Sequence, residues 1–221
     1  MPEHNEEKLT VTERTRLRRV RERGDFRRST INAILDAMPL CHVGYVLDGA
    51  PVVMPTLQWR EGDHVYWHAS NGGRGINAAA KQEVCLTVTL LDGLVLARSA
   101  MHHSANFRSV MLFGQPTLIT DREEKIQKFK GLIEHFTPGR WDLLRPMSEA
   151  EEKQTAVLSL PIKEGSAKIR AAGVSDDEAD YALPIWAGVV PISLRTGAPE
   201  PDPRNLPGVE MPAHVSKVKL G

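Results

Sequence analysis

The sequence predicts a mainly β protein in which antiparallel strands close into a barrel and helices flank it. From Leu40 onward the chain carries short runs rich in β-branched and aromatic residues, which are typical of strands. The pairs Asp48-Gly49 and Asp92-Gly93 supply the positive φ that tight hairpin turns need. Four or five such strands within about 80 residues favour a closed barrel over an open sheet.

Two helices are expected before the first strand. The first covers residues 13–23, capped by Thr10 or Thr12, within an Arg-rich stretch. The second covers residues 28–38, where apolar side chains recur at helical spacing, and it ends before Pro39.

The later elements follow from the same patterns. Strands are expected over residues 41–47, 51–60, 64–70, 84–99 (broken at Asp92-Gly93), 107–119, 156–161 and 185–192. A glycine-rich loop after residue 70 leads into a short helix, and residues 140–155 are expected to be helical but short. Asp121–Phe136 is expected to be a helix because its apolar residues form one stripe.

One large domain is expected at residues 26–193. An Arg-rich helical arm precedes it at residues 1–25, and a Pro-rich extended tail follows at residues 194–221. The two cysteines, Cys41 and Cys85, lie in apolar settings and are expected to be buried thiols of a reducing compartment. With no apolar signal segment and no apolar run near about 18 residues, a cytoplasmic protein without membrane contact is expected.

The charge balance argues against a nucleic-acid-binding protein. Lys plus Arg number 28 and Asp plus Glu number 28, so the formal net charge is zero. Arginines crowd the first 28 residues, but acidic residues interleave with them and no aromatic residue lies among them to stack a base. A solvated surface is the favoured interpretation of this stretch, and a nucleic-acid-binding regulator is kept as an alternative.

The segment HVYWHASNGGRGINAAAK, residues 64–81, is a possible phosphate site. A strand that ends in Ser70 and a glycine-rich loop with Arg74 places backbone N–H groups and a guanidinium toward one anion. The glycines do not fit GxGxxG or GxxxxGK[ST], so neither a Rossmann nor a P-loop nucleotide site is predicted.

Four segments in order extend this pattern: PVVMPT at 51–56, VYWHAS at 65–70 with Arg74, LVLARSAMHHSANFRSVMLFGQP at 94–116, and IWAGVVPI at 185–192. Over roughly residues 26–192 the chain resembles the pyridoxamine 5′-phosphate oxidase-like flavoproteins, in the FMN-binding branch that includes the nitroimidazole-resistance proteins. The resemblance implies a six-stranded split β-barrel that binds FMN at the interface of a homodimer.

The resemblance also implies which residues meet the flavin. They are Pro55, Thr56, Tyr66, Trp67, His68, Ser70, Arg74, Asn77, Asn106, Phe107, Arg108, Ser109 and Trp186. Backbone groups of the first strands line the ring, Ser70 and Arg74 hold the phosphate, residues 106–109 often come from the partner subunit, and Trp186 closes the pocket. His68 and His103 are candidate catalytic residues, as proton donors beside the flavin.

The chain departs from its relatives at Gly75, where many have a second basic residue, and this leaves a deazaflavin cofactor open. It also lacks the Arg-x-His pair with which the true pyridoxamine phosphate oxidases hold their substrate, so vitamin B6 oxidation is not expected. No metal site is predicted, because His68, His102 and His103 have no carboxylate or Cys companion at ligand spacing.

An FMN-dependent oxidoreductase is the predicted function. Hydride would come from a nicotinamide cofactor or a reductase partner and pass to a small planar acceptor, while the protein orients the flavin. The alternatives are a flavin- or haem-binding module without turnover and a deazaflavin-dependent reductase. A haem site would need a histidine that projects into a cavity.

Overall fold

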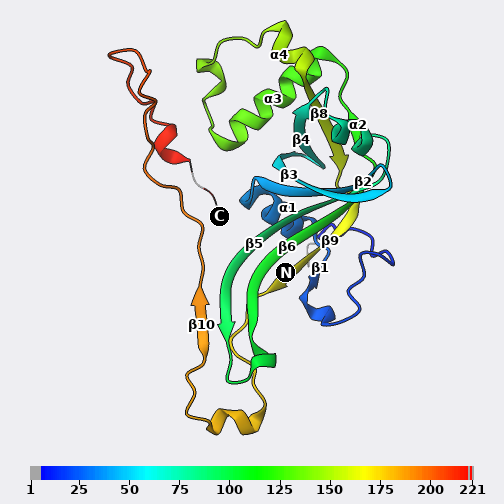
Figure 1. The fold of residues 1–221 in the computed structure, drawn as a ribbon, viewed down its shortest axis with the longest axis vertical. Coiled ribbons are helices and arrows are strands. Elements are labelled where there is room, and N and C mark those ends of the chain that lie inside the picture. The colour runs from blue at the N-terminus through cyan, green and yellow to red at the C-terminus, as the bar shows by residue number, and fades with distance from the viewer. Residues whose placement is uncertain (1–5, 219, 221) are drawn as a thin grey trace.

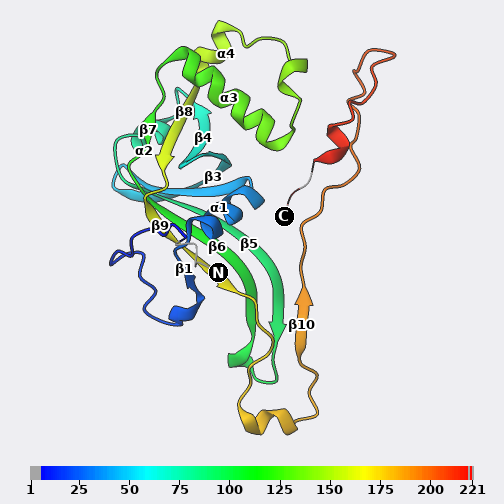
Figure 2. The same ribbon diagram turned by 180° about the vertical axis from the view of Figure 1, so that it is seen from behind.

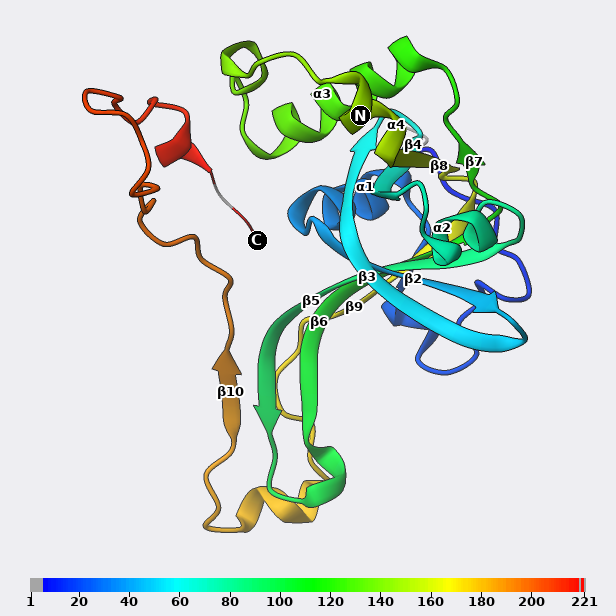
Figure 3. The same ribbon diagram turned by 45° about the horizontal axis from the view of Figure 1, so that its top comes forward.

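The computed structural model describes residues 6–218 and 220. Its strands are β1 (Gly24–Asp25), β2 (Leu40–Leu47), β3 (Ala50–Glu61), β4 (His64–Ser70), β5 (Val84–Leu96), β6 (Ser104–Gly114), β7 (Thr117–Leu118), β8 (Thr155–Pro161), β9 (Glu164–Arg170) and β10 (Gly188–Pro191). They form one antiparallel sheet in the order β1-β9-β6-β5-β2-β3-β4-β8-β7, with β10 on the side of β5. Figure 3 shows β3 curving over the barrel.

Four α-helices flank the sheet. They are α1 (Arg28–Ala37), α2 (Arg74–Ala79), α3 (Arg122–Phe136) and α4 (Glu149–Gln154). The Asp121 carboxylate caps α3 by accepting from the Glu124 N–H at 2.8 Å, and Ser148 and Glu151 form a capping box on α4. Short 3-10 helices lie at η1 (Arg21–Arg23), η2 (Ala100–His102), η3 (Trp141–Leu143), η4 (Glu178–Ala182) and η5 (Val215–Lys217).

The barrel encloses the main hydrophobic core. Alternate residues of β2, β5 and β6 point inward and pack against α1, and the fully buried side chains include Ile31, Leu35, Val43, Trp67, Leu86, Val88 and Leu112. A second, smaller cluster lies outside the barrel wall, where Trp59 and Tyr66 pack beneath α3 with Leu132 and Val157. The expected mainly β fold with flanking helices is confirmed.

The β5–β6 hairpin extends beyond the barrel. Figure 1 shows both strands running away from the barrel to a tip at the opposite end of the molecule from α3 and α4. β10 pairs with the outer part of β5, Gly188 with Leu96 and Pro191 with Gly93. In Figure 2 the chain after β10 returns along the molecule toward the α3 end, without a strand or an α-helix between residues 192 and 218. Among the described residues after β10, the only regular element is the short 3-10 helix Val215–Lys217.

The strand count exceeds the six that the resemblance implied. The sequence analysis missed β9 because Glu164–Arg170 contains a single β-branched residue, Ile169, and small residues in its centre. Those small residues fit there because β9 lies very close to β6: a Cβ on Gly165 would come within 2.6 Å of the Met111 carbonyl oxygen. β1 and β7 are two-residue pairings too short for a sequence pattern.

Two expected features are wrong. Asp92-Gly93 does not break the strand, because the β5–β6 ladder continues through it with a register shift, which is a β-bulge. The Arg-rich stretch is not α-helical over its described residues, where only η1 is regular. Val20 adopts a left-handed backbone at φ 52°, and Arg14 pairs instead with Glu83 and Glu164 across the sheet edge.

Within residues 6–218 and 220, no helix combines the length and the apolar character needed to cross a membrane. Both cysteines are free: Cys41 is buried, which raises the pKa of its thiol to about 12, and Cys85 is partly exposed.

Gly165→Ala is expected to lower the free energy of unfolding by about 1–3 kcal/mol, because its methyl group would overlap the β6 backbone. Gly173→Ala is the matched control, since a Cβ there meets no atom within 4 Å. Urea unfolding of both variants measures the difference. Equal stability of the two would contradict the close β6–β9 approach.

Candidate functional site

An open apolar groove lies between α3, η3 and α4, with His68 of β4 at its base. Its volume is about 450 Å³, and most of its lining is apolar, from Phe129, Ile133, Trp141, Leu144 and Met147. Tyr66 and His68 alternate with Trp67 along β4, so the tyrosine and the histidine point toward α3 while the tryptophan points into the barrel. The strand thus places one imidazole in an apolar groove.

His68 has few partners in this groove. Its ring meets Phe129 edge-on, with centroids 5.7 Å apart, and Nδ1 is buried without a hydrogen bond to any described residue. Burial lowers the pKa of His68, because the charged imidazolium loses its hydration there. A neutral imidazole with an unpaired nitrogen is suited to accept a hydrogen bond or to ligate a metal.

A charged pair lies at the rim of the same groove. Arg145 binds the Glu151 carboxylate through two contacts, Nη2 to Oε1 at 2.6 Å and Nη1 to Oε2 at 2.9 Å. Hydrogen bonds from Arg145 and Ser148 hold the pKa of Glu151 at about 2. The rim therefore offers a guanidinium to an anionic group, while the base of the groove offers an imidazole.

The expected phosphate residues cluster beside this groove, after β4. Ser70 is exposed and its carbonyl accepts from the Gly73 N–H at 2.9 Å. Asn77 donates to the Gly73 and Asn71 carbonyls at 3.3 and 3.4 Å, which closes the loop, and Arg74 forms an exposed ion pair with Asp48. The loop and its arginine lie on the surface, where an anion can reach them.

The structure explains the departure at Gly75. A Cβ at this position would lie 2.3 Å from the Tyr45 hydroxyl oxygen, and Tyr45 is buried in the barrel wall. Any side chain at position 75 would displace Tyr45. The tyrosine therefore excludes the second basic residue that many relatives carry.

The remaining residues of the first strands are divided between core and surface. The indole of Trp67 and the ring of Tyr66 are buried, so these residues can meet a ligand through their backbone only. Pro55 is exposed, and the Thr56 hydroxyl donates to the His68 carbonyl at 3.4 Å. Of these residues, Thr56 is therefore joined directly to the β4 backbone at His68.

A second group lies on β6. Arg108 donates to the Asp92 carboxylate, from Nη2 to Oδ1 at 2.8 Å and from Nε to Oδ2 at 3.0 Å. This pair lines a hollow of about 370 Å³, together with Leu90 and Ile192. Hydrogen bonding to Asp92 raises the pKa of Arg108. Asn106 accepts from Arg170 Nη1 at 2.5 Å, and the Ser109 hydroxyl donates to the Lys168 carbonyl at 3.3 Å. Phe107 lies under the Lys168 ammonium, 6.0 Å from it.

Two expected residues lie far from His68 within one chain. His103 is exposed at the hairpin tip, where its Nδ1 contacts the Ser99 carbonyl at 2.9 Å, while β4 lies in the other half of the molecule (Figure 1). Trp186, just before β10, is 70% exposed. A single chain therefore brings together the residues of β3, β4 and α2, and leaves those of β6, the tip and Trp186 apart from them.

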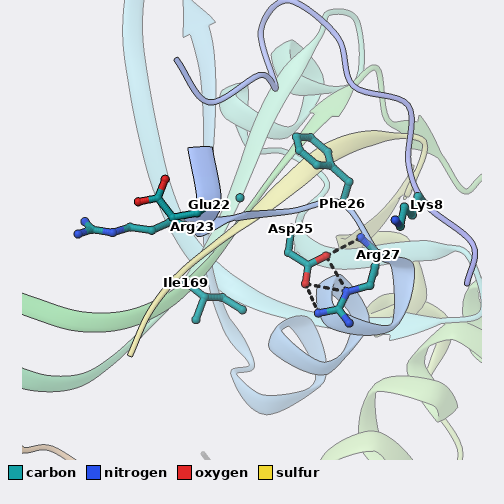
Figure 4. A pocket seen from close by; sticks show the side chains of 8 residues that line it. Lys8, Glu22, Arg23, Asp25, Phe26, Arg27 and Ile169 are labelled. Carbon is teal, nitrogen blue, oxygen red and sulfur yellow. Dashed lines mark hydrogen bonds and ion pairs between the residues drawn. The ribbon is translucent and has the colours of Figure 1, made fainter. Parts of the chain in front are cut away.

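Another hollow, of about 470 Å³, lies near the N-terminus and is drawn in Figure 4. Its central acid, Asp25, is fully engaged by Arg27 and by the Thr30 hydroxyl at 2.8 Å. Burial raises the pKa of Asp25, but these hydrogen bonds outweigh it and set the value at about 2. Because its most buried charged group, Asp25, is already paired within the chain, this hollow is not the candidate site.

The apolar residues that line the His68 groove were not among the site residues predicted from sequence. In the sequence, the apolar stripe of residues 121–136 served only to predict a helix. The sequence signal was the width of the apolar stripe of α3, of which the structure buries only Leu132 and leaves Phe129 and Ile133 to line the groove.

Comparisons with known proteins identify one family and several related structures. A family model described as pyridoxamine 5′-phosphate oxidase matches residues 27–169. The flavocytochrome Anf3 from Azotobacter vinelandii has 50% sequence identity and a TM-score of 0.92, covering 95% of this chain and 98% of that chain. An FAD and haem binding protein from Mycobacterium smegmatis has 33% identity and a TM-score of 0.84, covering 89% and 97%.

A putative 5-nitroimidazole antibiotic resistance protein from Bacteroides thetaiotaomicron has 26% identity and a TM-score of 0.54, covering 64% of this chain and 83% of that chain. No curated protein sequence is significantly similar to the chain.

His68→Gln is expected to make the free energy of unfolding less sensitive to acid between about pH 7.5 and 5.5. Burial keeps the folded-state pKa of His68 below the unfolded value of about 6.5, so the unfolded state takes up the proton first as the pH falls. Wild-type stability therefore declines through this window, and the variant lacks that part of the decline. Urea unfolding at both pH values measures it; identical pH dependence would contradict a buried neutral imidazole.

Proposed function

Because this chain belongs to the pyridoxamine 5′-phosphate oxidase family, we propose that it is a flavin-dependent oxidoreductase that also binds haem. The observation that carries the proposal is the 50% identity to a flavocytochrome along 95% of the chain. We take FAD as the flavin, in place of the FMN expected from sequence, because the Mycobacterium smegmatis relative is named for FAD. Bound flavin supplies hydride acceptance, and bound haem supplies one-electron exchange.

The loop after β4 is the proposed flavin phosphate site. Arg74 is 75% exposed on its side chain, and its pair with Asp48 is a surface ion pair, which contributes little and exchanges readily for a phosphate. The exposed Ser70 hydroxyl lies at the start of the same loop. The backbone of β4 beside Thr56 then faces the ring, with the buried side chain of Trp67 holding the strand in place.

The His68 groove is the proposed haem site. Haem iron in proteins is commonly held by a histidine, and the surrounding pocket is largely apolar. His68 meets the first requirement because its imidazole is neutral and Nδ1 lacks a partner among the described residues. Leu144, Met147 and Trp141 meet the second, and Arg145 can leave Glu151 to bind a propionate.

A second copy of the chain is proposed to complete the flavin site. Apolar side chains are exposed over β2, β3, β5 and β10, namely Leu40, Val46, Val53, Leu57, Leu91, Leu94, Val189 and Val190. A surface of this kind marks an association site. Pairing of two copies is also the simplest way to bring β6 residues and Trp186 to the β4 backbone, since one chain keeps them apart. A nicotinamide cofactor as hydride donor and a small planar acceptor complete the proposal.

The absorption spectrum of the freshly purified protein tests the cofactors. Flavin bands together with a Soret band are expected, and mass spectrometry of the material released by heat identifies FAD or FMN. His68→Ala is expected to lose the Soret band and keep the flavin bands, while His64→Ala, on the same strand, keeps both. A flavin-free protein that takes up no added flavin would overturn the oxidoreductase proposal; loss of neither band in His68→Ala would overturn the haem assignment.

Val53→Asp is expected to convert a dimer of about twice 24.5 kDa into monomers and to weaken flavin retention at least about tenfold, because Val53 is 66% exposed on the proposed interface and a buried carboxylate there is costly. Val11→Asp, at an exposed valine outside these strands, is the matched control. Light scattering gives the mass. A monomeric wild-type protein with full flavin occupancy would contradict the shared site.

A further inference from the structure

The tip of the β5–β6 hairpin meets the loop that leads to β10. In Figure 2, η2 at the end of the hairpin and η4 in the loop lie side by side at one end of the molecule. The segment that leads into η4, residues 175–181, is acidic. The fold brings this segment to His102.

Three side chains with metal-ligand atoms converge at this junction. They belong to His102, Asp177 and Asp180, and their ligand atoms lie within 4.8 Å of one another. Within this group, His102 Nε2 lies 3.9 Å from Asp177 Oδ1. Zinc binds nitrogen and carboxylate oxygen at about 2.0–2.2 Å, so two ligands of one ion lie up to about 4 Å apart. The His102–Asp177 separation already meets this distance, and the separations within the group of three do not exceed 4.8 Å.

The imidazole is already oriented for such a role. Ser99 Oγ lies 2.7 Å from His102 Nδ1, which fixes the ring and leaves Nε2 toward the two carboxylates. A hydrogen bond on the second ring nitrogen is the usual support of a metal-binding histidine. The Ser99 carbonyl in turn contacts His103 Nδ1 at 2.9 Å, so the η2 turn that carries both histidines is held together.

An ion pair with a buried carboxylate anchors the loop that carries the aspartates. Asp176, whose side chain has 0% exposure, accepts from Arg98 Nη1 at 3.0 Å and from the Arg98 backbone N–H at 3.2 Å. Arg98 also stacks on Tyr181, 5.0 Å from the ring centroid. Arg98 thus neutralises Asp176 and leaves the charges of Asp177 and Asp180 unmatched. Over residues 6–218, neither aspartate forms an ion pair with a Lys or Arg.

We propose that His102, Asp177 and Asp180 bind one divalent transition-metal ion, for which zinc is the probe of choice. One imidazole and two carboxylates match the preferences of zinc, and water fills the remaining coordination position. The ion ties the η4 loop to the hairpin tip and thereby fixes the start of β10. The proposal does not rest on the proposed function, because none of the three residues belongs to the flavin or haem sites.

Isothermal titration of the tag-free, full-length protein, in the state in which it is purified, with zinc chloride tests the site. One ion per chain is expected to bind, and His102→Ala and Asp180→Asn are each expected to weaken this binding more than about tenfold. Two matched controls are expected to bind as the wild type does: His103→Ala removes the neighbouring histidine, and Glu178→Gln removes a charge from the same turn.

Hydrogen exchange supplies a second readout. Zinc is expected to slow exchange in residues 171–187 of the wild type and of Glu178→Gln, and to leave it unchanged in His102→Ala. Circular dichroism confirms that each variant is folded. Absence of zinc binding by the wild type, equal binding by His102→Ala, or equal loss in Glu178→Gln would each overturn the proposal.

Discussion

The long antiparallel ladder between β5 and β6 is the constraint on which most of the structure depends. Its inner half closes the barrel, with Leu86 and Val88 packed on the side of the core. The pairing continues to Val95 and Ser104, well beyond the barrel, and the register shift between Leu91 and Gly93 falls along this outer course. Because a bulge bends a strand and sharpens its twist, it redirects the hairpin where the core no longer supports it. The outer half therefore needs other contacts: β10 on one edge and the η4 loop at the tip.

Alternation along β4 decides which side chains can take part in binding. Trp67 faces the barrel and is fully buried, while Tyr66 and His68 face α3. Tyr66 is buried between β3 and α3, because Trp59 of β3 stacks on it at 5.6 Å and Lys128 of α3 lies 4.6 Å from its ring. His68 lies two residues further along β4, is only partly buried and lines the groove. The same strand thus separates a packed aromatic cluster from an imidazole with an unpaired nitrogen.

Many charged side chains of this protein form ion pairs within the chain. The Arg-rich N-terminal stretch attaches to the barrel through Arg14, which joins Glu164 of β9 and Glu83 just before β5. Hydrogen bonds from Arg14 and Thr12 hold the pKa of Glu164 at about 2, so this attachment persists over the ordinary pH range. Two groups differ from this pattern: Arg74 is paired only with the exposed Asp48, and Asp177 and Asp180 have no Lys or Arg partner among the described residues.

The sequence by itself determined the strands whose side chains carry the pattern. β2, β3 and β4 agree with their predicted ranges within one residue at each end, and α1 and α3 do likewise, because alternation and helical periodicity are local properties. The family resemblance and the loop from Ser70 to Arg74 were also predicted, from motifs that occur in order along the sequence. Only the tertiary structure decided the rest. β9 forms because small residues fit against β6, and Asp92 becomes a bulge because its partner strand continues. The Arg-rich stretch forms turns and the short helix η1 in place of an α-helix, and Arg14 joins it to distant acids. The His68 groove and the meeting of His102 with Asp177 likewise arise from segments far apart in the chain, whose contact no local pattern encodes.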